Sequence, residues 1–226
     1  MKSFIKSLLR EGLNESTYVW YHGTPDVRDL ESDGGFTERS ITAEYIEDLD
    51  KYNEIQRQLD IARENDDDGA YHKYIAMVGP LRKKFTIRKP IFLTNVHSVA
   101  KTYADPQRAF DYQNSVEKVL KVSVNSNRGI TIVATGDRFR FININKVKQG
   151  FKNAGISEDE FNLVFNQFNF HTQNRDNIRT DDIAILGEYF GFDYIDIVGV
   201  LDSYNNGNTK STVRMVFNPK DIKILQ

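Results

Sequence analysis

The chain has no cysteine in its 226 residues. Disulfides, thiolate metal sites and a cysteine nucleophile are therefore excluded, and a reducing compartment is in keeping with this. The histidines lack the HxxxH and HExxH spacings that zinc enzymes use; they are His22, His72, His97 and His171. The sequence also has no GxxxxGKS/T loop, no GxGxxG and no GxSxG elbow. Generic catalytic motifs thus leave the function open.

Long apolar runs and a strong net charge are also missing. The formal net charge of −2 gives no electrostatic reason to expect nucleic acid or an anionic membrane as a partner. The opening segment, MKSFIKSLLREGL, is too short and too charged to span a membrane, and it lacks the apolar run of a signal peptide. Its apolar residues recur at helical spacing, which predicts an amphipathic helix over residues 1–14. We therefore expect a cytoplasmic protein.

Apolar residues make up 39% of the chain, with 15 Phe and 11 Tyr, which is enough for the core of one domain over residues 15–226. Runs of β-branched and aromatic residues predict strands at 17–21, 90–94, 116–124, 129–134, 138–142, 194–201, 212–217 and 222–225. Periodicity and capping signals predict helices at 98–104, 146–154, 158–168 and 180–190. Ser157 and Glu160 form a capping box, Thr180 caps the last helix and Gly191 ends it. Strands at both ends with helices between them indicate an α+β fold.

A helical hairpin is predicted between the first two β-rich segments. From Ile41 to Leu59 apolar residues recur at spacings of three and four, which predicts one long helix that ends at 65–69. A second helix is expected over about 70–84. Together they form an insertion at about 41–84. The basic runs 82–84 and 88–89 are interpreted as solvated surface, with a binding patch as the alternative.

The segment Tyr21-His22-Gly23-Thr24 lies where the first predicted strand opens into a loop. A glycine lets the backbone approach a planar ligand closely, so that its N–H and C=O can pair with an amide. His22 can donate to a hydroxyl, and Thr24 offers a second side-chain contact. A hydrogen-bonded core histidine is the alternative interpretation of His22.

Two further segments follow in order. Residues 90–103 (PIFLTNVHSVAKTY) place the aromatic residues Phe92 and Tyr103 eleven residues apart across a strand and a helix. Residues 212–222 (TVRMVFNPKDI) form a strand that ends in a proline turn. Both aromatic residues also have an ordinary core interpretation.

Taken together, the three segments resemble the ADP-ribosyltransferase superfamily, in the His-Tyr-Glu branch of diphtheria-like toxins and poly-ADP-ribose polymerases. The strings YHGT, IFLT…AKTYA and MVFNPKDIKIL are most similar to the ADP-ribosyltransferase domains of polyvalent proteins of phages and mobile elements. The opening MKSFIKSLLREGL also resembles tailed-phage proteins. The resemblance implies split antiparallel β-sheets with flanking helices, NAD as the substrate, and a host protein as the target.

The resemblance also implies roles for single residues. His22 would bind the adenosine ribose of NAD, the backbone of Gly23 would pair with the nicotinamide carboxamide, and Thr24 would assist. Tyr103 matches the tyrosine that stacks on nicotinamide, whereas Phe92 keeps the ring of the other family tyrosine and lacks its hydroxyl. The expected NAD pocket consists of Tyr21, His22, Gly23, Thr24, Phe92, Thr94 and Tyr103.

The third segment departs from the family at its catalytic glutamate. Alignment on the Val-Phe pair puts Val213 at that position and Arg214 after it. Cleavage of the ribose C–N bond passes through an oxocarbenium-like state, for which a carboxylate is the natural electrostatic partner. Asp196 and Asp202, on or just after the neighbouring strand, are the candidates for this role.

The leading hypothesis is a phage-encoded mono-ADP-ribosyltransferase that modifies a host protein and needs no metal. A catalytically inactive binding, inhibitor or virion protein with the same fold is the first alternative. An NAD glycohydrolase, with water as the acceptor, is the second. Arg28 and Arg39 are solvated loop charges or, as the alternative, contacts of the NAD pyrophosphate.

Overall fold

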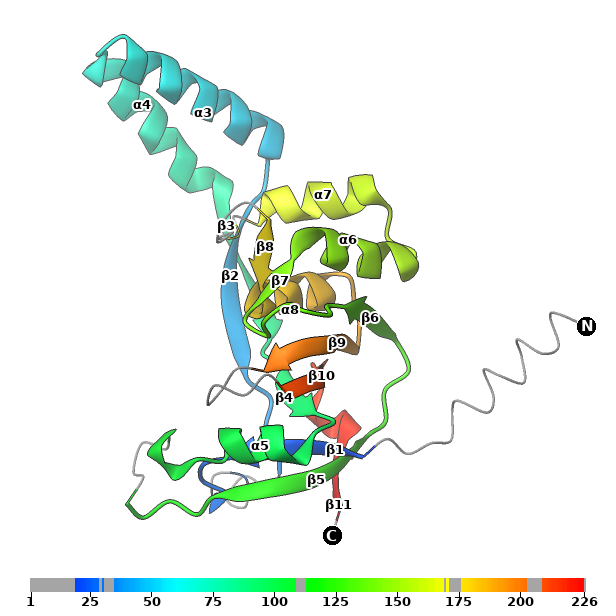
Figure 1. Cartoon of the computed structure of the whole chain (residues 1–226). Coiled ribbons are helices and arrows are strands. Elements are labelled where there is room, and N and C mark those ends of the chain that lie inside the picture. Colours follow the sequence, from blue (N-terminus) through cyan, green and yellow to red (C-terminus); the bar gives the residue numbers. More distant parts are fainter. Residues whose placement is uncertain are drawn as a thin grey trace, which may run out of the picture.

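The computed structural model describes residues 19–28, 30, 35–108, 113–168, 170, 176–202 and 209–225. The predicted helix over residues 1–14 lies outside this part. The described residues form an α+β fold, as expected, with helices gathered on a large mixed sheet (Figure 1). No helix among them is long and apolar enough to cross a membrane.

The large sheet has seven strands in the order β11-β5-β1-β4-β10-β9-β6. Their bounds are β1 Trp20–Thr24, β4 Ile91–Thr94, β5 Lys118–Val124, β6 Gly129–Val133, β9 Tyr194–Asp202, β10 Thr209–Val216 and β11 Ile222–Leu225. The described neighbours in this sheet pair antiparallel, as expected, except that β6 pairs with β9 in parallel and makes the sheet mixed. Three helices lie between these two strands in the chain, and such a crossover allows parallel pairing.

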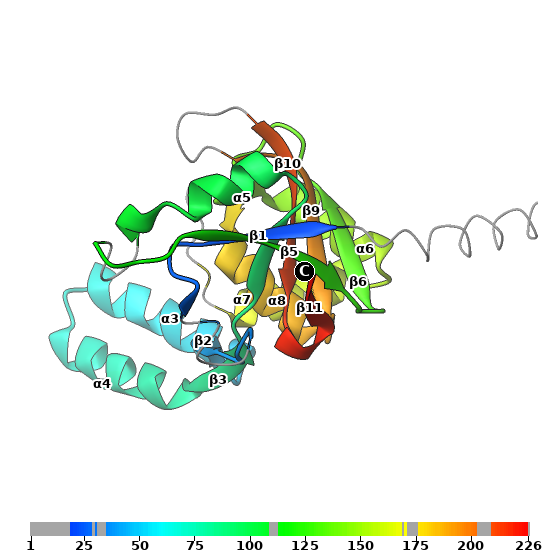
Figure 2. The same cartoon turned by 90° about the horizontal axis from the view of Figure 1, so that it is seen from below.

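The sheet nearly divides between β1 and β4, which share only the register pair Tyr21↔Thr94. In contrast, β1 pairs with β5 over five positions, and β4 pairs with β10 over four. Figure 2 shows that β1 and β5 run across the direction of β9 and β10. Residues 22–24 were expected to begin a loop, but they continue β1 against β5 and diverge from β4.

Three helices and a short ribbon cover the part of the sheet formed by β6, β9 and β10. They are α6 Ile144–Asn153, α7 Glu158–Gln167, α8 Thr180–Tyr189, β7 Phe141–Asn143 and β8 Asn177–Arg179. The Ser157 hydroxyl accepts from the Glu160 amide, which confirms the predicted cap of α7. Thr180 is the first residue of α8 and not its cap, which is Arg179. Gly191, at φ 72°, follows the end of this helix as predicted.

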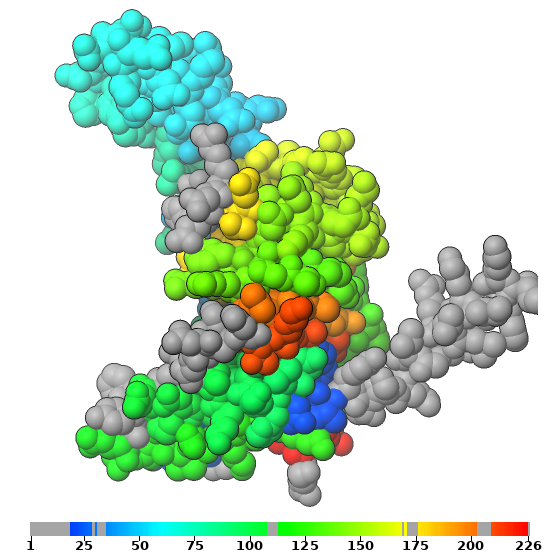
Figure 3. All heavy atoms as spheres, in the orientation of Figure 1, coloured from blue at the N-terminus to red at the C-terminus, as the bar shows by residue number. Residues whose placement is uncertain are grey.

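The helical hairpin is the tip of an arm that stands out from the body (Figures 1 and 3). The arm consists of β2 Ser40–Ile46, α3 Leu49–Glu64, α4 Asp68–Val78 and β3 Arg82–Arg88. The predicted helix over 41–46 is therefore wrong, as is helix at 82–84, because β2 and β3 pair along their whole length. Ile41 and Tyr45 are four residues apart, a spacing that fits a strand as well as a helix. The main core packs against Ile41, Ala43 and Tyr45. These alternate residues share one face only in a strand, so their contacts with the core select the strand.

Candidate functional site

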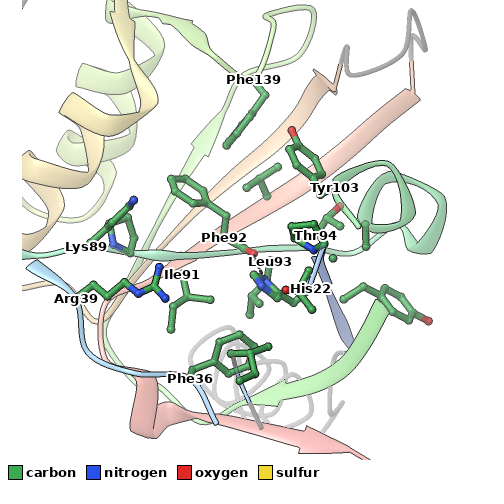
Figure 4. Close-up of a pocket in the computed structure, with 18 of the residues that line it drawn as sticks. His22, Phe36, Arg39, Lys89, Ile91, Phe92, Leu93, Thr94, Tyr103 and Phe139 are labelled. Carbon is green, nitrogen blue, oxygen red and sulfur yellow. Dashed lines mark hydrogen bonds between the residues drawn. The ribbon is translucent and has the colours of Figure 1, made fainter. Parts of the chain in front are cut away.

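A cavity of about 690 Å³ opens where β1 and β4 diverge (Figure 4). It is bounded by these strands, by α5 His97–Tyr103, by the two ends of the arm, by the end of β9 and by the middle of β10. All seven residues of the expected NAD pocket line it: Tyr21, His22, Gly23, Thr24, Phe92, Thr94 and Tyr103. Asp202 and Val213 also line the cavity, whereas Asp196 does not.

The His22 side chain bridges the gap between the two diverging strands. Its Nδ1 lies 3.0 Å from the carbonyl oxygen of Phe92. A carbonyl only accepts, so Nδ1 carries the hydrogen and Nε2 is left as an acceptor. Burial lowers the pKa of His22, with the hydrogen bond to Phe92 opposing it, and the ring is therefore neutral at pH 7. With Nδ1 engaged, the nitrogen left for a ligand hydroxyl is Nε2, which can accept a hydrogen bond but cannot donate the one expected from the sequence.

Gly23 allows α5 to pack directly on β1. A Cβ atom at this position would lie 1.9 Å from the carbonyl oxygen of Ala100. No side chain fits there, so glycine is required for the helix to approach. The helix ends at Tyr103, and its close approach brings that ring to the cavity.

The hydroxyls of the two threonines in the expected pocket serve local turns. Thr24 donates to the carbonyl oxygen of Asp26 at 2.9 Å, and Thr94 accepts from the amide of Val96 at 3.2 Å. Each hydroxyl can make further hydrogen bonds, Thr24 as an acceptor and Thr94 as a donor.

Tyr103 and Asp202 form a hydrogen-bonded pair at the cavity wall. The tyrosine hydroxyl donates to the aspartate Oδ1 at 3.0 Å and Oδ2 at 3.2 Å. Asp202 is only 5% exposed. The pair joins the end of α5 to the end of β9 and thereby places a carboxylate beside an aromatic face.

A bulge in β9 directs Asp202 towards the cavity. Ile195 and Ile197 are buried by strict alternation, but the register with β10 shifts between Ser211 and Thr212. Gly199, with φ 77°, is the extra residue. A bulge of this kind changes which side chains face inward. After it the buried residues are Val200 and Asp202.

Asp196 lies before the bulge and faces the other side of the sheet. It pairs with Arg214 through two hydrogen bonds of 2.7 and 2.6 Å. The guanidinium carbon of Arg214 is 4.4 Å from the ring centroid of Trp20 and 4.1 Å from that of Tyr194. This packing gives Asp196 a structural role. Of the two expected carboxylates, only Asp202 is at the cavity.

Sequence reasoning does not place four of the lining residues in this site: Phe36, Phe139, Arg39 and Lys89. It treats Arg39 and Lys89 separately, as loop or surface charges. Phe36 lies edge-on to His22, with 5.0 Å between the ring centroids. Phe139 lies edge-on to Phe92, with 5.6 Å between the ring centroids. Arg39 and Lys89 lie at the two ends of the arm, where it joins the body. The sequence carries no motif for these residues, because they come from separate loops that meet only in the folded chain.

Comparison with known protein families, with curated proteins and with solved structures gave no match. Across the described ranges no group of three or more potential metal ligands is present. The site combines apolar walls, a neutral histidine and a tyrosine–carboxylate pair. The apolar walls and the histidine suit a ligand with planar rings and hydroxyl groups. The carboxylate suits a reaction in which positive charge develops on that ligand.

Proposed function

We propose that this chain is an NAD-dependent mono-ADP-ribosyltransferase, encoded by a phage and acting on a host protein in the host cytoplasm. The observation that carries the proposal is the Tyr103–Asp202 pair, which lines the same cavity as His22 and Gly23. The division of the sheet between β1 and β4 supports an ADP-ribosyltransferase-like fold. The three segments of the sequence resemblance meet at that division.

The chemistry asks for a carboxylate near the nicotinamide ribose. The C1′–N bond breaks, its electron pair leaves with nicotinamide, and positive charge develops on the ribose. Asp202 would stabilise this charge, and Tyr103 would stack on nicotinamide while its hydroxyl holds the carboxylate in place. The acceptor side chain then attacks C1′ and loses its proton to solvent. His22 would accept a hydrogen bond from a hydroxyl of the adenosine ribose through Nε2.

NAD labelled in the adenylate part, incubated with the protein and a bacterial lysate, tests the proposal. A transferase puts label on protein, and the Asp202→Asn variant should lose this activity. Asp105→Asn is a matched control, since Asp105 follows Tyr103 by two residues in the chain but does not line the cavity. NAD left intact by the wild-type protein in lysates from several hosts would contradict the proposal.

One observation favours a second candidate, a binding or virion protein that has the fold without the transfer activity. Val213, 3% exposed, lines the cavity at the position where the resemblance implies a glutamate. In that case NAD would bind and stay intact. An NAD glycohydrolase would use the same cavity with water as the acceptor, and would release free ADP-ribose without labelling protein.

A further inference from the structure

The two ends of the arm carry a pair of cations at the cavity. Arg39 immediately precedes β2 and Lys89 immediately follows β3. The Lys89 amide donates to the Arg39 carbonyl oxygen at 2.6 Å, so the two residues lie side by side at the root of the arm. Figure 4 shows the Arg39 side chain extended beside Ile91, on the far side of Phe92 from Tyr103. The cavity therefore has a cationic end and a carboxylate end.

These two cations differ from other basic side chains nearby, because neither has an ion-pair partner among the residues that the structure describes. In the described part of the chain, no ion pair or side-chain hydrogen bond is found for Arg39 or Lys89. Arg88, the last residue of β3, pairs with Glu188 at 2.7 Å, and Arg28 is held by Asp26. Arg28 is the other arginine considered for the pyrophosphate, and its side chain is already hydrogen-bonded to Asp26.

The carboxylates at the cavity do not neutralise the cationic end. Asp26, whose pKa is lowered to about 2 mainly by its hydrogen bonds to Arg28, is committed to that partner. Asp202 accepts a hydrogen bond from the Tyr103 hydroxyl at the opposite end of the cavity. Glu38, adjacent to Arg39 in the chain, does not line the cavity. Arg39 and Lys89 are both exposed where they line the cavity, and positive charge gathered at a cleft steers anions towards it.

We propose that Arg39 and Lys89 bind the diphosphate of a dinucleotide, so that the ligand spans the cavity from Asp202 to the root of the arm. The inference rests on the proposed function for the identity of the dinucleotide as NAD. The arginine fork can bind two phosphate oxygens at once, and the lysine adds a point charge. The ligand class is thus an ester of a nucleoside diphosphate.

The ligand would then contact both strands of the arm. Because Arg39 leads into β2 and Lys89 continues from β3, one diphosphate bound to both side chains fixes the arm root against the cavity. Amide hydrogen exchange should slow at residues 39–41 and 87–89 when ADP is added.

Calorimetric titration with ADP and with adenosine separates diphosphate recognition from recognition of the nucleoside. Arg39→Ala and Lys89→Ala should each weaken ADP binding roughly ten-fold, the scale of one lost charge-assisted contact, and leave adenosine binding unchanged. Arg39→Lys should retain part of the affinity, and the salt dependence of ADP binding should decrease in the double variant. Arg82→Ala and Lys84→Ala are matched controls, because both residues are exposed on β3 away from the cavity.

The outcomes distinguish this inference from the proposed function. Cation-dependent ADP binding without NAD cleavage would support the subsite and contradict the enzyme. NAD cleavage with unchanged ADP affinity in both alanine variants would support the enzyme and overturn the subsite. Equal weakening of ADP and adenosine, or no ADP binding by the wild-type protein, would also overturn it. Thermal melting of each variant checks that the fold is kept.

Discussion

The hydroxyl of Tyr103 donates to both carboxylate oxygens of Asp202, at 3.0 and 3.2 Å, across 99 positions of sequence. Two glycines make this contact possible. Gly23 lets α5 lie on β1, and Gly199 forms the bulge that directs the aspartate inward. The proposed catalytic carboxylate therefore depends on backbone geometry at two places where a side chain would not fit without displacing a neighbour.

Replacing Asp202 by asparagine removes the charge and keeps the shape. We expect NAD cleavage to fall by about 10²–10³-fold, the scale for loss of one preorganised electrostatic partner of a transition state. Binding of NAD, measured by calorimetry, should change little. The Asp105→Asn control should retain full activity, and a loss of less than ten-fold in Asp202→Asn would rule out Asp202 as the main electrostatic partner.

Tyr103 offers a test that separates the ring from the hydroxyl. Tyr103→Phe keeps the stacking face and loses the hydrogen bond to Asp202, so kcat should fall about ten-fold while KM changes little. Tyr103→Ala removes both and should raise KM as well. Steady-state kinetics on NAD give both parameters, and equal kinetics for the two variants would contradict a stacking role.

Gly23→Ala tests the approach of α5 to β1. The added methyl group would overlap the Ala100 carbonyl, so the helix must move. We expect a loss of about 1–3 kcal/mol in the free energy of unfolding, the usual cost of overpacking. Urea denaturation measures it. Gly79→Ala, where a Cβ meets no atom within 4 Å, is the control and should be near neutral.

Asp196 is predicted to matter for stability and not for chemistry. Asp196→Ala leaves Arg214, only 13% exposed, without its carboxylate between β9 and β10, which should cost about 3–5 kcal/mol, the scale for one partner lost from a buried pair. Asp60→Ala breaks an exposed pair with Arg63 and should cost under about 1 kcal/mol. NAD affinity of folded Asp196→Ala, measured below its melting temperature, should equal that of the wild-type protein.

His22 should make stability depend on pH. Its folded pKa lies below the ordinary value of about 6.5, so below that pH the unfolded chain binds more protons than the folded one. This contribution is present above pH 6.5 and decreases as the pH falls towards the folded pKa. His22→Asn can still donate to the Phe92 carbonyl but does not titrate.

As the pH falls from 7 to 5, the unfolding free energy of the wild-type protein should therefore decrease relative to that of His22→Asn. Urea denaturation at several pH values measures this difference. Parallel curves would show that the imidazole has the same pKa in the folded and the unfolded chain, contrary to the prediction.

The α+β class and most strands and helices of the body could be predicted from the sequence, because they depend on local patterns. The β-branched runs around β5, β9 and β10 and the cap at Ser157 act within a few residues. The order of the three segments was enough to expect His22, Gly23 and Tyr103 near one another. In the folded chain they line one cavity.

Tertiary structure alone decided what depends on residues distant in the chain. The spacing of Ile41 and Tyr45 fits helix and strand equally, and only pairing with β3 and burial on the core select the strand. The choice of Asp202 over Asp196 follows from the Gly199 bulge, which reverses the alternation that a sequence pattern assumes. Arg39 and Lys89 are 50 positions apart and meet because the arm between them returns to its starting point. Local propensity acts over a few residues, whereas the cavity is made by contacts between segments that the chain brings together only on folding.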